Sequence, residues 1–340
     1  MIDSIIASDL DASKQRLDEE AFHSRKILVT GGAGFMGSWL CDILLSAKAA
    51  VHTIDNLSTG LMENIDHLLD DKNFTFQKSD VTQPGLRDEK CELILHFASR
   101  ASPEEYQQHP IETLTANSQG TQNMLELARK NDAALIYAST SEVYGDAQVI
   151  PTPETYWGNV NPIGPRSCYD EGKRYGEALC IAYQRTYNLD ARIVRIFNTF
   201  GPRIRADGAY ARAVPRFIQQ ALKGEDITVF GDGKQTRSFC YITDTIAGII
   251  KIATHSEARG EVFNIGNPQE ITILDLAHKV KKLAGSASRI VHRPLPPEDP
   301  RRRCPEISKA CELLDWSPTI GLEDGLEKTI LWFKSNLTPR

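Results

Sequence analysis

Short apolar runs alternate with amphipathic stretches along the first 200 residues of the chain. The runs cover residues 26–30, 50–54, 74–77, 93–97, 134–138 and 192–196. Between them lie stretches with a helical spacing of apolar residues, of which 38–46, 114–130 and 172–187 are the clearest. Strands that alternate with helices form a parallel sheet with helices on both faces. We therefore predict an α/β fold, a doubly wound parallel sheet.

A glycine-rich turn joins the first apolar run to the helical stretch that follows it. The residues of this turn that we expect to contact a ligand are Gly31, Gly34, Phe35, Met36 and Gly37. Glycines at a strand–turn–helix junction let the backbone approach a pyrophosphate, whose charge the helix N-terminus stabilises. The same glycines would also suit a tight turn without a ligand. A second feature is therefore needed to distinguish a dinucleotide site from such a turn.

That second feature is Asp55, at the end of the second apolar run. A carboxylate there accepts hydrogen bonds from the ribose hydroxyls of a dinucleotide and repels a 2′-phosphate. Because residues 56–59 supply no arginine that could bind such a phosphate, we predict NAD rather than NADP as the cofactor. Further expected cofactor contacts are Asn56, Asp80, Val81 and Ala98, although Asp80 alone could be a loop cap.

Composition and charge exclude several other classes of protein. The chain is 41% apolar and 25% charged with a net charge of -6, so it can form a core and has no general affinity for nucleic acid. No apolar run is long enough to span a membrane, and the N-terminus lacks a signal-peptide pattern. The seven cysteines are scattered, which argues against zinc or disulfides. We expect a cytoplasmic protein without a metal.

Beyond Gly201 proline and glycine break the chain into short segments. We expect this part to form a smaller lobe over the carboxyl ends of the strands, where open α/β sheets bind their ligands. The predicted organisation is a partly ordered helical arm at 1–24, a dinucleotide-binding domain at 25–200 with a returning segment at about 235–263, and a substrate-binding lobe at 201–234 and 264–340.

Two polar patterns are candidates for catalysis. Tyr169 and Lys173 are four residues apart at the start of a helical stretch, so their side chains share one face. A lysine ammonium beside a phenol favours the phenolate, which can act as a base. Such a pair is common on surfaces, but here it follows a dinucleotide turn. Thr140, Ser141 and Glu142 come just after the run 134–138, at the ligand crevice, where a simple helix cap would use similar residues.

Together these motifs resemble a known enzyme family. The glycine turn, Ser-Thr-Ser-Glu-Val-Tyr-Gly at 139–145, the Tyr-x-x-x-Lys pair and Arg-Ile-Phe-Asn-Thr-Phe-Gly-Pro-Arg at 195–203 resemble the extended short-chain dehydrogenase/reductases that act on nucleotide sugars. Residues 161–174, which contain Tyr-Asp-Glu-Gly-Lys, are similar to the UDP-glucuronate decarboxylases, also called UDP-xylose synthases. The likeness runs from about residue 26 to residue 333, nearly the whole chain outside the arm.

The resemblance implies NAD-dependent decarboxylation of UDP-glucuronate to UDP-xylose with recycling of the cofactor. Tyr169 would take the proton of the sugar 4-hydroxyl while hydride passes from C4 to NAD, and Lys173 would hold the phenolate and the nicotinamide ribose. The 4-keto sugar then loses carbon dioxide. Glu142, with Ser141, is the candidate for handling the proton at C5, and Thr140 would hydrogen-bond the reacting hydroxyl.

The resemblance also implies contacts to a UDP-sugar. Arg237 and Arg303 would reach the diphosphate or ribose, and Asn198 would help to position the diphosphate. The adjacent Arg301 and Arg302 are expected to face solvent. Family members pair through two helices of the sheet domain, here 114–130 and 172–187, so we expect a homodimer.

Two departures from the family pattern bear on specificity. The segment 204–216, expected over the nucleoside, is slightly longer than usual in the family. The resemblance therefore indicates the reaction more firmly than it indicates the nucleobase of the substrate. Arg100 stands where the family commonly has proline, and it would add a cation near the sugar. A nucleotide-sugar 4-epimerase and a 4,6-dehydratase are the alternative enzymes, and a non-catalytic dinucleotide sensor is the alternative of another class.

Overall fold

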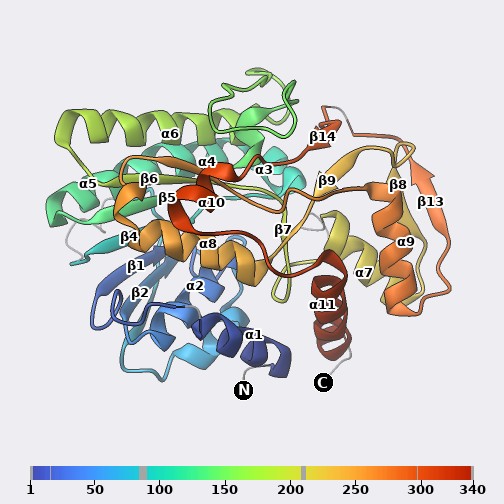
Figure 1. Cartoon of the computed structure of the whole chain (residues 1–340), viewed down its shortest axis with the longest axis horizontal. Coiled ribbons are helices and arrows are strands. Elements are labelled where there is room, and N and C mark those ends of the chain that lie inside the picture. Colours follow the sequence, from blue (N-terminus) through green and yellow to red (C-terminus); the bar gives the residue numbers. More distant parts are fainter. Residues whose placement is uncertain (1–2, 16, 84–89, 208–211, 297, 338–340) are drawn as a thin grey trace.

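A computed structural model of the protein describes residues 3–15, 17–83, 90–207, 212–296 and 298–337. Its centre is a seven-stranded sheet with the strand order β11-β6-β5-β4-β1-β2-β3 (Figure 1), and every neighbouring pair is parallel. The strands are β1 (Lys26–Thr30), β2 (Ala50–Asp55), β3 (Phe74–Lys78), β4 (Leu93–His96), β5 (Ala134–Thr140), β6 (Ala191–Ile196) and β11 (Val262–Ile265). The predicted doubly wound sheet is confirmed, and β11 is an additional edge strand.

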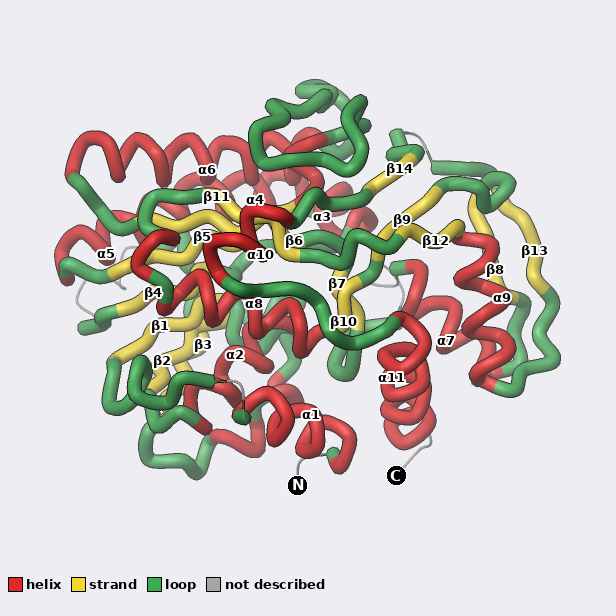
Figure 2. The backbone as a smooth tube through the Cα atoms, viewed as in Figure 1, coloured by secondary structure: helices red, strands yellow, loops and turns green. Residues whose placement is uncertain are grey.

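Helices cover both faces of the sheet (Figure 2). On one face lie α2 (Phe35–Ser46) and α8 (Ile242–Thr254), and on the other lie α5 (Thr121–Asn131) and α6 (Ser167–Tyr187). Successive side chains of a strand point to opposite faces of the sheet, so each strand contributes apolar side chains to the core on either face. Ile27 and Val29 pack with the α2 side, whereas Leu28 between them packs with the α5 and α6 side. The strand order reverses between β1 and β4, which is where doubly wound sheets bind dinucleotides.

The stretch 114–130 is not one regular α-helix. It comprises the end of α4 (Pro110–Thr115), a π-helical segment (Ala116–Gly120) and most of α5. A Cβ atom added at Gly120 would lie 2.7 Å from Val81 Cγ2, so the loop after β3 packs closely against this segment. The helix predicted at 172–187 begins earlier, at Ser167, and therefore carries Tyr169 in its first turn.

The N-terminal segment is helical and packed into the molecule. Its helix α1 (Ser4–Lys14) contacts α2, α8 and the C-terminal helix α11 (Leu322–Leu337). Asp9 of α1 is only 2% exposed, accepts a 2.6 Å hydrogen bond from the Tyr241 hydroxyl and pairs with Lys328. Phe22 is fully buried. Helix α1 therefore connects the helices α2 and α8 of the sheet region with α11 near the end of the chain.

The part after β6 contributes short elements beside the carboxyl ends of the strands. Its helices are α7 (Ala213–Lys223), α9 (Ile273–Ala284), α10 (Ser308–Leu314) and α11. The strand pairings outside the main sheet are β7 (Thr199–Phe200) with β10 (Cys240–Tyr241), β8 (Ile227–Phe230) with β13 (Ile290–Arg293), and β9 (Thr236–Ser238) between β12 (Glu270–Thr272) and β14 (Arg302–Arg303). Helices α7 and α9 pack on each other and on β8. This second lobe covers one side of the ligand crevice.

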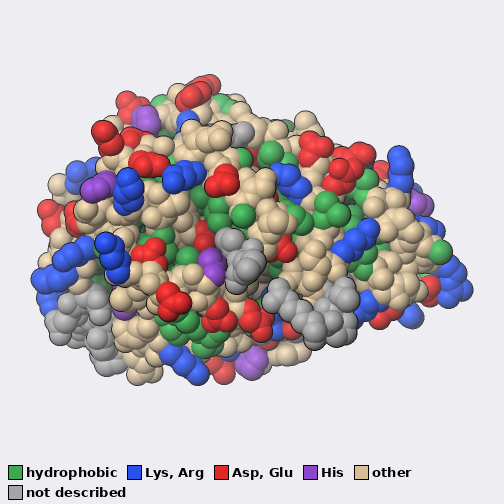
Figure 3. Space-filling view, turned by 90° about the horizontal axis from the view of Figure 1, so that it is seen from below, with side chains coloured by type: hydrophobic (Ala, Val, Ile, Leu, Met, Phe, Trp, Pro, Cys, Tyr) green, Lys and Arg blue, Asp and Glu red, His purple; other side chains and the backbone are tan. Residues whose placement is uncertain are grey.

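Charged side chains of both signs are distributed over the face shown in Figure 3. Among the described residues, no helix has both the length and the apolar character that crossing a membrane requires. Within the same residues, no group of three or more His, Cys, Asp or Glu side chains is placed to hold a metal ion.

Candidate active site

A cavity of about 910 Å³ is lined by the carboxyl ends of the strands and by the second lobe. Its lining includes every residue that the sequence analysis proposed for catalysis, for the cofactor or for the substrate. Those residues come from segments that lie far apart in sequence, from the glycine turn to β14.

The glycine turn brings the backbone close to the loop after β4. Gly31 has a φ of +74°, and a Cβ atom there would lie 2.9 Å from the backbone nitrogen of Ala98. At Gly37 a Cβ atom would lie 2.1 Å from the carbonyl oxygen of Gly31. The N-terminus of α2 follows at once and carries no side-chain cap. This leaves a narrow backbone cradle with helix N–H donors that suits a pyrophosphate.

Asp55 is held by the backbone at the end of β2. Its carboxylate accepts hydrogen bonds from the N–H groups of Leu57 (2.8 Å) and Ala33 (3.1 Å), and it is 7% exposed. Burial raises the pKa of Asp55, while these two hydrogen bonds oppose the rise. Beside it, the Asn56 side chain donates to Asp80 Oδ2 over 2.7 Å. A fixed acceptor next to an amide suits the hydroxyls of an adenosine ribose, so the residues fit NAD.

Tyr169 and Lys173 lie on the buried face of α6. The Lys173 ammonium group donates a 2.8 Å hydrogen bond to the Ala138 carbonyl at the end of β5, and its Nζ is 5.9 Å from the centre of the Tyr169 ring. The Tyr169 ring stacks on Tyr106, with ring centres 4.9 Å apart. Thr140 completes the group, and its side chain partly offsets the rise that burial causes in the pKa of Tyr169.

The charge state of the pair differs from our expectation. We expected Lys173 to favour the phenolate of Tyr169, but burial raises the pKa of Tyr169 to about 12, even with Arg212 and the Thr140 hydrogen bond opposing the rise. Burial also lowers the pKa of Lys173 to about 7. For both groups burial is the largest cause of the shift, and burial disfavours the charged form. The phenol is therefore neutral near pH 7.

Glu142 lies between two arginines. It is in the short 3-10 helix Ser141–Tyr144. Thr140 is the N-cap of this helix, so Thr140 has the capping role that the sequence also allowed. Arg166 and Arg303 both donate to the Glu142 carboxylate, and the contact from Arg303 Nη2 measures 2.9 Å. Although burial opposes it, the two arginines hold the pKa of Glu142 well below its usual range. Glu142 is therefore an ionised carboxylate that holds no proton to donate.

The residues proposed to bind the substrate differ in whether they already have a partner within the protein. Arg303 was expected to reach a diphosphate or ribose, whereas here it binds Glu142. Arg237 forms a 2.9 Å ion pair with Asp299, and Arg100 forms one of 2.5 Å with Glu105. Asn198 is the exception, because its side-chain nitrogen is buried without a hydrogen-bond partner among the described residues. An unpaired buried donor at a cavity suits a ligand acceptor.

Several residues around the site escaped the sequence analysis. Arg166 stands three residues before Tyr169, but nothing in the pattern indicated its partner. Tyr106 and Asp170 are buried beside it, and each has a side-chain oxygen without a hydrogen-bond partner among the described residues. Burial, followed by the nearby Glu142, raises the pKa of Asp170 to about 7.

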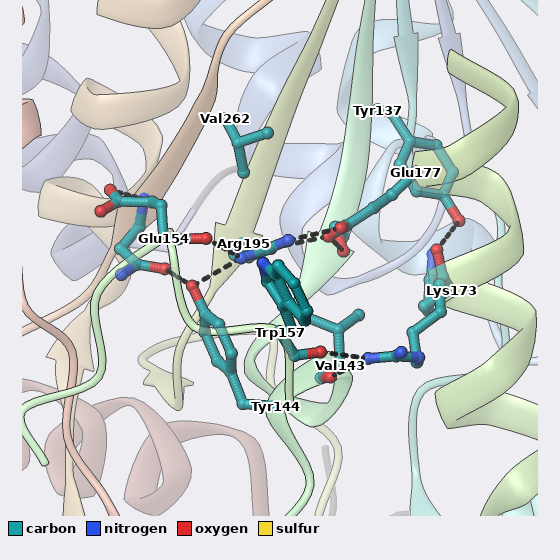
Figure 4. Close-up of polar contacts among 12 residues, drawn as sticks. Tyr137, Val143, Tyr144, Glu154, Trp157, Lys173, Glu177, Arg195 and Val262 are labelled. Atoms are coloured by element: carbon teal, nitrogen blue, oxygen red, sulfur yellow. Dashed lines mark hydrogen bonds and ion pairs between the residues drawn. The ribbon is translucent and has the colours of Figure 1, made fainter. Parts of the chain in front are cut away.

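A buried network behind Lys173 ties α6 to the sheet (Figure 4). Arg195 of β6 forms two hydrogen bonds to the carboxylate of Glu177, of 2.9 and 2.7 Å, and a third of 2.9 Å to the Tyr144 hydroxyl. Glu177 lies one turn after Lys173 on α6 and also accepts from Ser139 of β5. The network therefore fixes the helix that carries Tyr169 and Lys173 against β5 and β6.

A dinucleotide turn and a buried Tyr-x-x-x-Lys pair at one cavity of a parallel sheet define the class, the extended short-chain dehydrogenase/reductases. Residues 27–266 match the family described as "NAD dependent epimerase/dehydratase family". The chain belongs to this family, which confirms NAD as the predicted cofactor.

Within this family, the chain is similar to several UDP-glucuronic acid decarboxylases. The chain is 47% identical over 313 residues to UDP-glucuronic acid decarboxylase 1 of Xenopus tropicalis, a match that covers 92% of this chain and 73% of that protein. UDP-glucuronic acid decarboxylase 3 of Arabidopsis thaliana is 47% identical over 302 residues, 88% of this chain and 86% of that one.

Solved structures of related enzymes have the same fold. UDP-glucose 4-epimerase of Thermotoga maritima aligns with a TM-score of 0.85 and 31% identity, over 92% of this chain and 99% of that one. The dTDP-glucose 4,6-dehydratase DesIV of Streptomyces venezuelae, solved with NAD bound, aligns with a TM-score of 0.83 and 28% identity, over 92% and 97%.

Proposed function

We propose that the protein converts UDP-glucuronate to UDP-xylose and carbon dioxide, with NAD reduced and reoxidised in each turnover. The observation that carries the proposal is the carboxylate of Glu142 between Arg166 and Arg303, at the same cavity as Tyr169 and Thr140. The similarity to UDP-glucuronic acid decarboxylases over 92% of the chain supports the same reaction.

The residues that hold NAD are the glycine turn, Asp55 and its neighbours, and Lys173. NAD bound there would supply the acceptor for the hydride from C4 of the sugar and, once reduced, the donor that returns it. Tyr169 accepts the proton of the 4-hydroxyl as the carbonyl forms, and Thr140 aligns that oxygen. Because the pKa of Tyr169 is raised in the protein alone, the phenol must first release its proton to water before the phenolate can serve as the base.

Decarboxylation follows because the new carbonyl lies β to the sugar carboxylate. The bond between C5 and the carboxyl carbon breaks, its electron pair passes into the C4 carbonyl to give an enolate, and carbon dioxide leaves. A proton is then added at C5. Since Glu142 is ionised, we assign it the role of orienting Ser141 or a water molecule that delivers this proton. Tyr169 finally returns its proton to O4 when the ketone is reduced.

The charge of Glu142 also bears on the alternative enzymes. A 4,6-dehydratase must protonate a leaving hydroxyl, and a carboxylate held by two arginines is a poor acid. Ser141 beside it is a poor general acid as well. A 4-epimerase requires no proton transfer at C5, so this buried cluster would have no function in it. A sensor would not need Tyr169 and Lys173.

We keep the proposal of a homodimer that pairs through α4, α5 and α6. Within the predicted stretches 114–130 and 172–187, Tyr187 is 53% exposed and Tyr175 is 47% exposed, and Leu114 is also exposed, which suits an apolar contact between copies. Light scattering after gel filtration measures the mass directly. We also keep the proposal of a cytoplasmic location, which rests on seven cysteines that are all free thiols.

Product analysis tests the reaction. The purified protein is incubated with UDP-glucuronate and NAD, and the sugar nucleotide is identified by NMR while carbon dioxide is trapped. We expect UDP-xylose and carbon dioxide in equal amounts, and neither from Tyr169→Phe. UDP-galacturonate without carbon dioxide would assign an epimerase instead.

A further inference from the structure

Most arginines that line the cavity are already neutralised by carboxylates. Arg166 and Arg303 pair with Glu142, and Arg237 pairs with Asp299. Further pairs in the lining join Arg100 with Glu105, Arg203 with Asp42, and Arg205 with Asp207. An anionic ligand would have to compete with these carboxylates for their arginines.

Arg212 and Arg216 also line the cavity, and no carboxylate partner is found for either among the described residues. Arg212 donates to the Ala101 carbonyl, whereas Arg216 has no such side-chain hydrogen bond. Arg216 is the fourth residue of α7, whose first four residues also line the cavity. Its guanidinium carbon lies 4.6 Å from the ring centre of Phe230 and 5.5 Å from that of Phe217. Its Nε is buried and has no hydrogen-bond partner among the described residues, and no ion pair to Arg216 is found within the same residues.

Arg216 as a whole is partly buried, and its buried Nε lacks a partner among the described residues, which is costly unless an anion reaches it. Burial lowers the pKa of Arg216 to about 10, against the opposing effect of Asp299, yet the group stays charged at neutral pH. Stacking on an aromatic ring uses the face of the guanidinium and leaves its N–H edges free for two parallel hydrogen bonds to phosphate oxygens. The stacked side chain is therefore prepared for an oxyanion.

We propose that Arg216 binds the diphosphate of the nucleotide sugar and is a determinant of substrate affinity. The inference rests on the proposed nucleotide-sugar substrate. The buried side-chain nitrogen of Asn198, also unpartnered among the described residues, supplies a second donor in the same cavity. The pyrophosphate of NAD is the other diphosphate in the cavity, but its cradle is the glycine turn at α2, on a different element.

Binding measurements distinguish whether Arg216 binds the diphosphate of the nucleotide sugar or the pyrophosphate of NAD. Isothermal titration is carried out with UDP, uridine and NAD on the wild type, Arg216→Lys and Arg216→Gln. The control is Arg289→Gln, which removes an exposed arginine of the same lobe that lies outside the cavity lining. We expect Arg216→Gln to weaken UDP about 10- to 100-fold, since charge-assisted hydrogen bonds are lost, and to leave uridine and NAD unchanged. The UDP affinity of Arg216→Lys should lie between those of the wild type and Arg216→Gln, because lysine keeps the charge but cannot form two parallel hydrogen bonds.

Steady-state kinetics gives an independent readout. For Arg216→Gln the KM for UDP-glucuronate should rise by the same factor as the dissociation constant of UDP, while kcat stays near the wild-type value. An equal loss of uridine affinity would overturn the proposal and assign Arg216 to the shape of the nucleoside site. Unchanged UDP affinity, or a loss of NAD affinity alone, would also overturn it. A wild type that binds no UDP would instead refute the proposed substrate and this inference with it.

Discussion

Replacing Glu142 by glutamine separates the two halves of the proposed reaction. The substitution preserves the shape of the side chain but removes the only carboxylate that the structure shows on Arg303. Buried Arg303 then loses its counter-charge, whereas Arg166 keeps the Asp170 carboxyl 3.9 Å away. Deleting one partner of a buried pair outright costs about 3–5 kcal/mol of stability, and the cost is less here because the amide oxygen can still accept a hydrogen bond. The hydroxyl chemistry at Tyr169 and Thr140 stays in place.

We expect the first oxidation to survive in Glu142→Gln and the later proton transfer to fail. Positioned proton-transfer groups contribute about 10²- to 10⁴-fold, so xylose formation should slow by that factor. The cofactor should then remain partly reduced while a keto sugar accumulates. Binding of UDP-glucuronate should not weaken, because the two arginines become free for its carboxylate.

Rapid mixing that follows the absorbance of the reduced cofactor, with mass spectrometry of quenched samples, measures both steps. Glu270→Gln is the matched control, since it removes a carboxylate from an arginine outside the cavity lining. Full turnover by Glu142→Gln would remove the carboxylate from the mechanism. Loss of the first reduction would mean that Glu142 orients the sugar for hydride transfer.

Three further substitutions test the cofactor site, a buried carboxyl and the N-terminal helix. Asp55→Ala should weaken NAD binding and relax the exclusion of NADP, and a wild type that already prefers NADP in titrations would contradict the ribose argument. The pKa of Asp170 is raised to about 7 from an ordinary 3.8, so the native state holds a proton that the unfolded state loses, and stability falls by about 1.4 kcal/mol per pH unit across this window. Asp170→Asn should therefore gain in melting temperature relative to the wild type as pH rises from 5 to about 7, and a constant difference would show that the carboxyl is not protonated. Asp9→Asn should lower the free energy of unfolding by about 1–3 kcal/mol, because Tyr241 and Lys328 lose a charged acceptor, and an unchanged urea midpoint would show that α1 adds no stability.

The main sheet and the cofactor side of the cavity could be predicted because their signals are local. The strands of the sheet are rich in apolar residues, the glycine turn directly follows β1, and Asp55 is the last residue of β2. The four-residue strand β11 was missed, since it is short and lies among irregular segments. The small strands of the second lobe are two to four residues long, too short for a periodic pattern.

The electrostatics of the site could not be read from the sequence. Arg303 meets Glu142 across a sequence separation of 161 residues, and no local pattern indicates such a pair. The stacking of Tyr106 on Tyr169 depends likewise on how α3 (Pro103–Gln108) packs against α6. Burial then raised the pKa of Tyr169, where proximity in sequence had suggested a lowering by Lys173. Residue types near a motif thus indicated the chemistry, whereas charge states depended on the fold.

The fate of the C4 hydrogen tests the central claim most directly. UDP-glucuronate labelled with deuterium at C4 is converted in ordinary water, unlabelled substrate is converted in heavy water, and both products are examined by NMR. We predict UDP-xylose that retains deuterium at C4 in the first reaction and gains one deuterium at C5 in the second, with no net reduced NAD. Loss of the C4 label to solvent, or reduced NAD formed in proportion to product, would contradict the account.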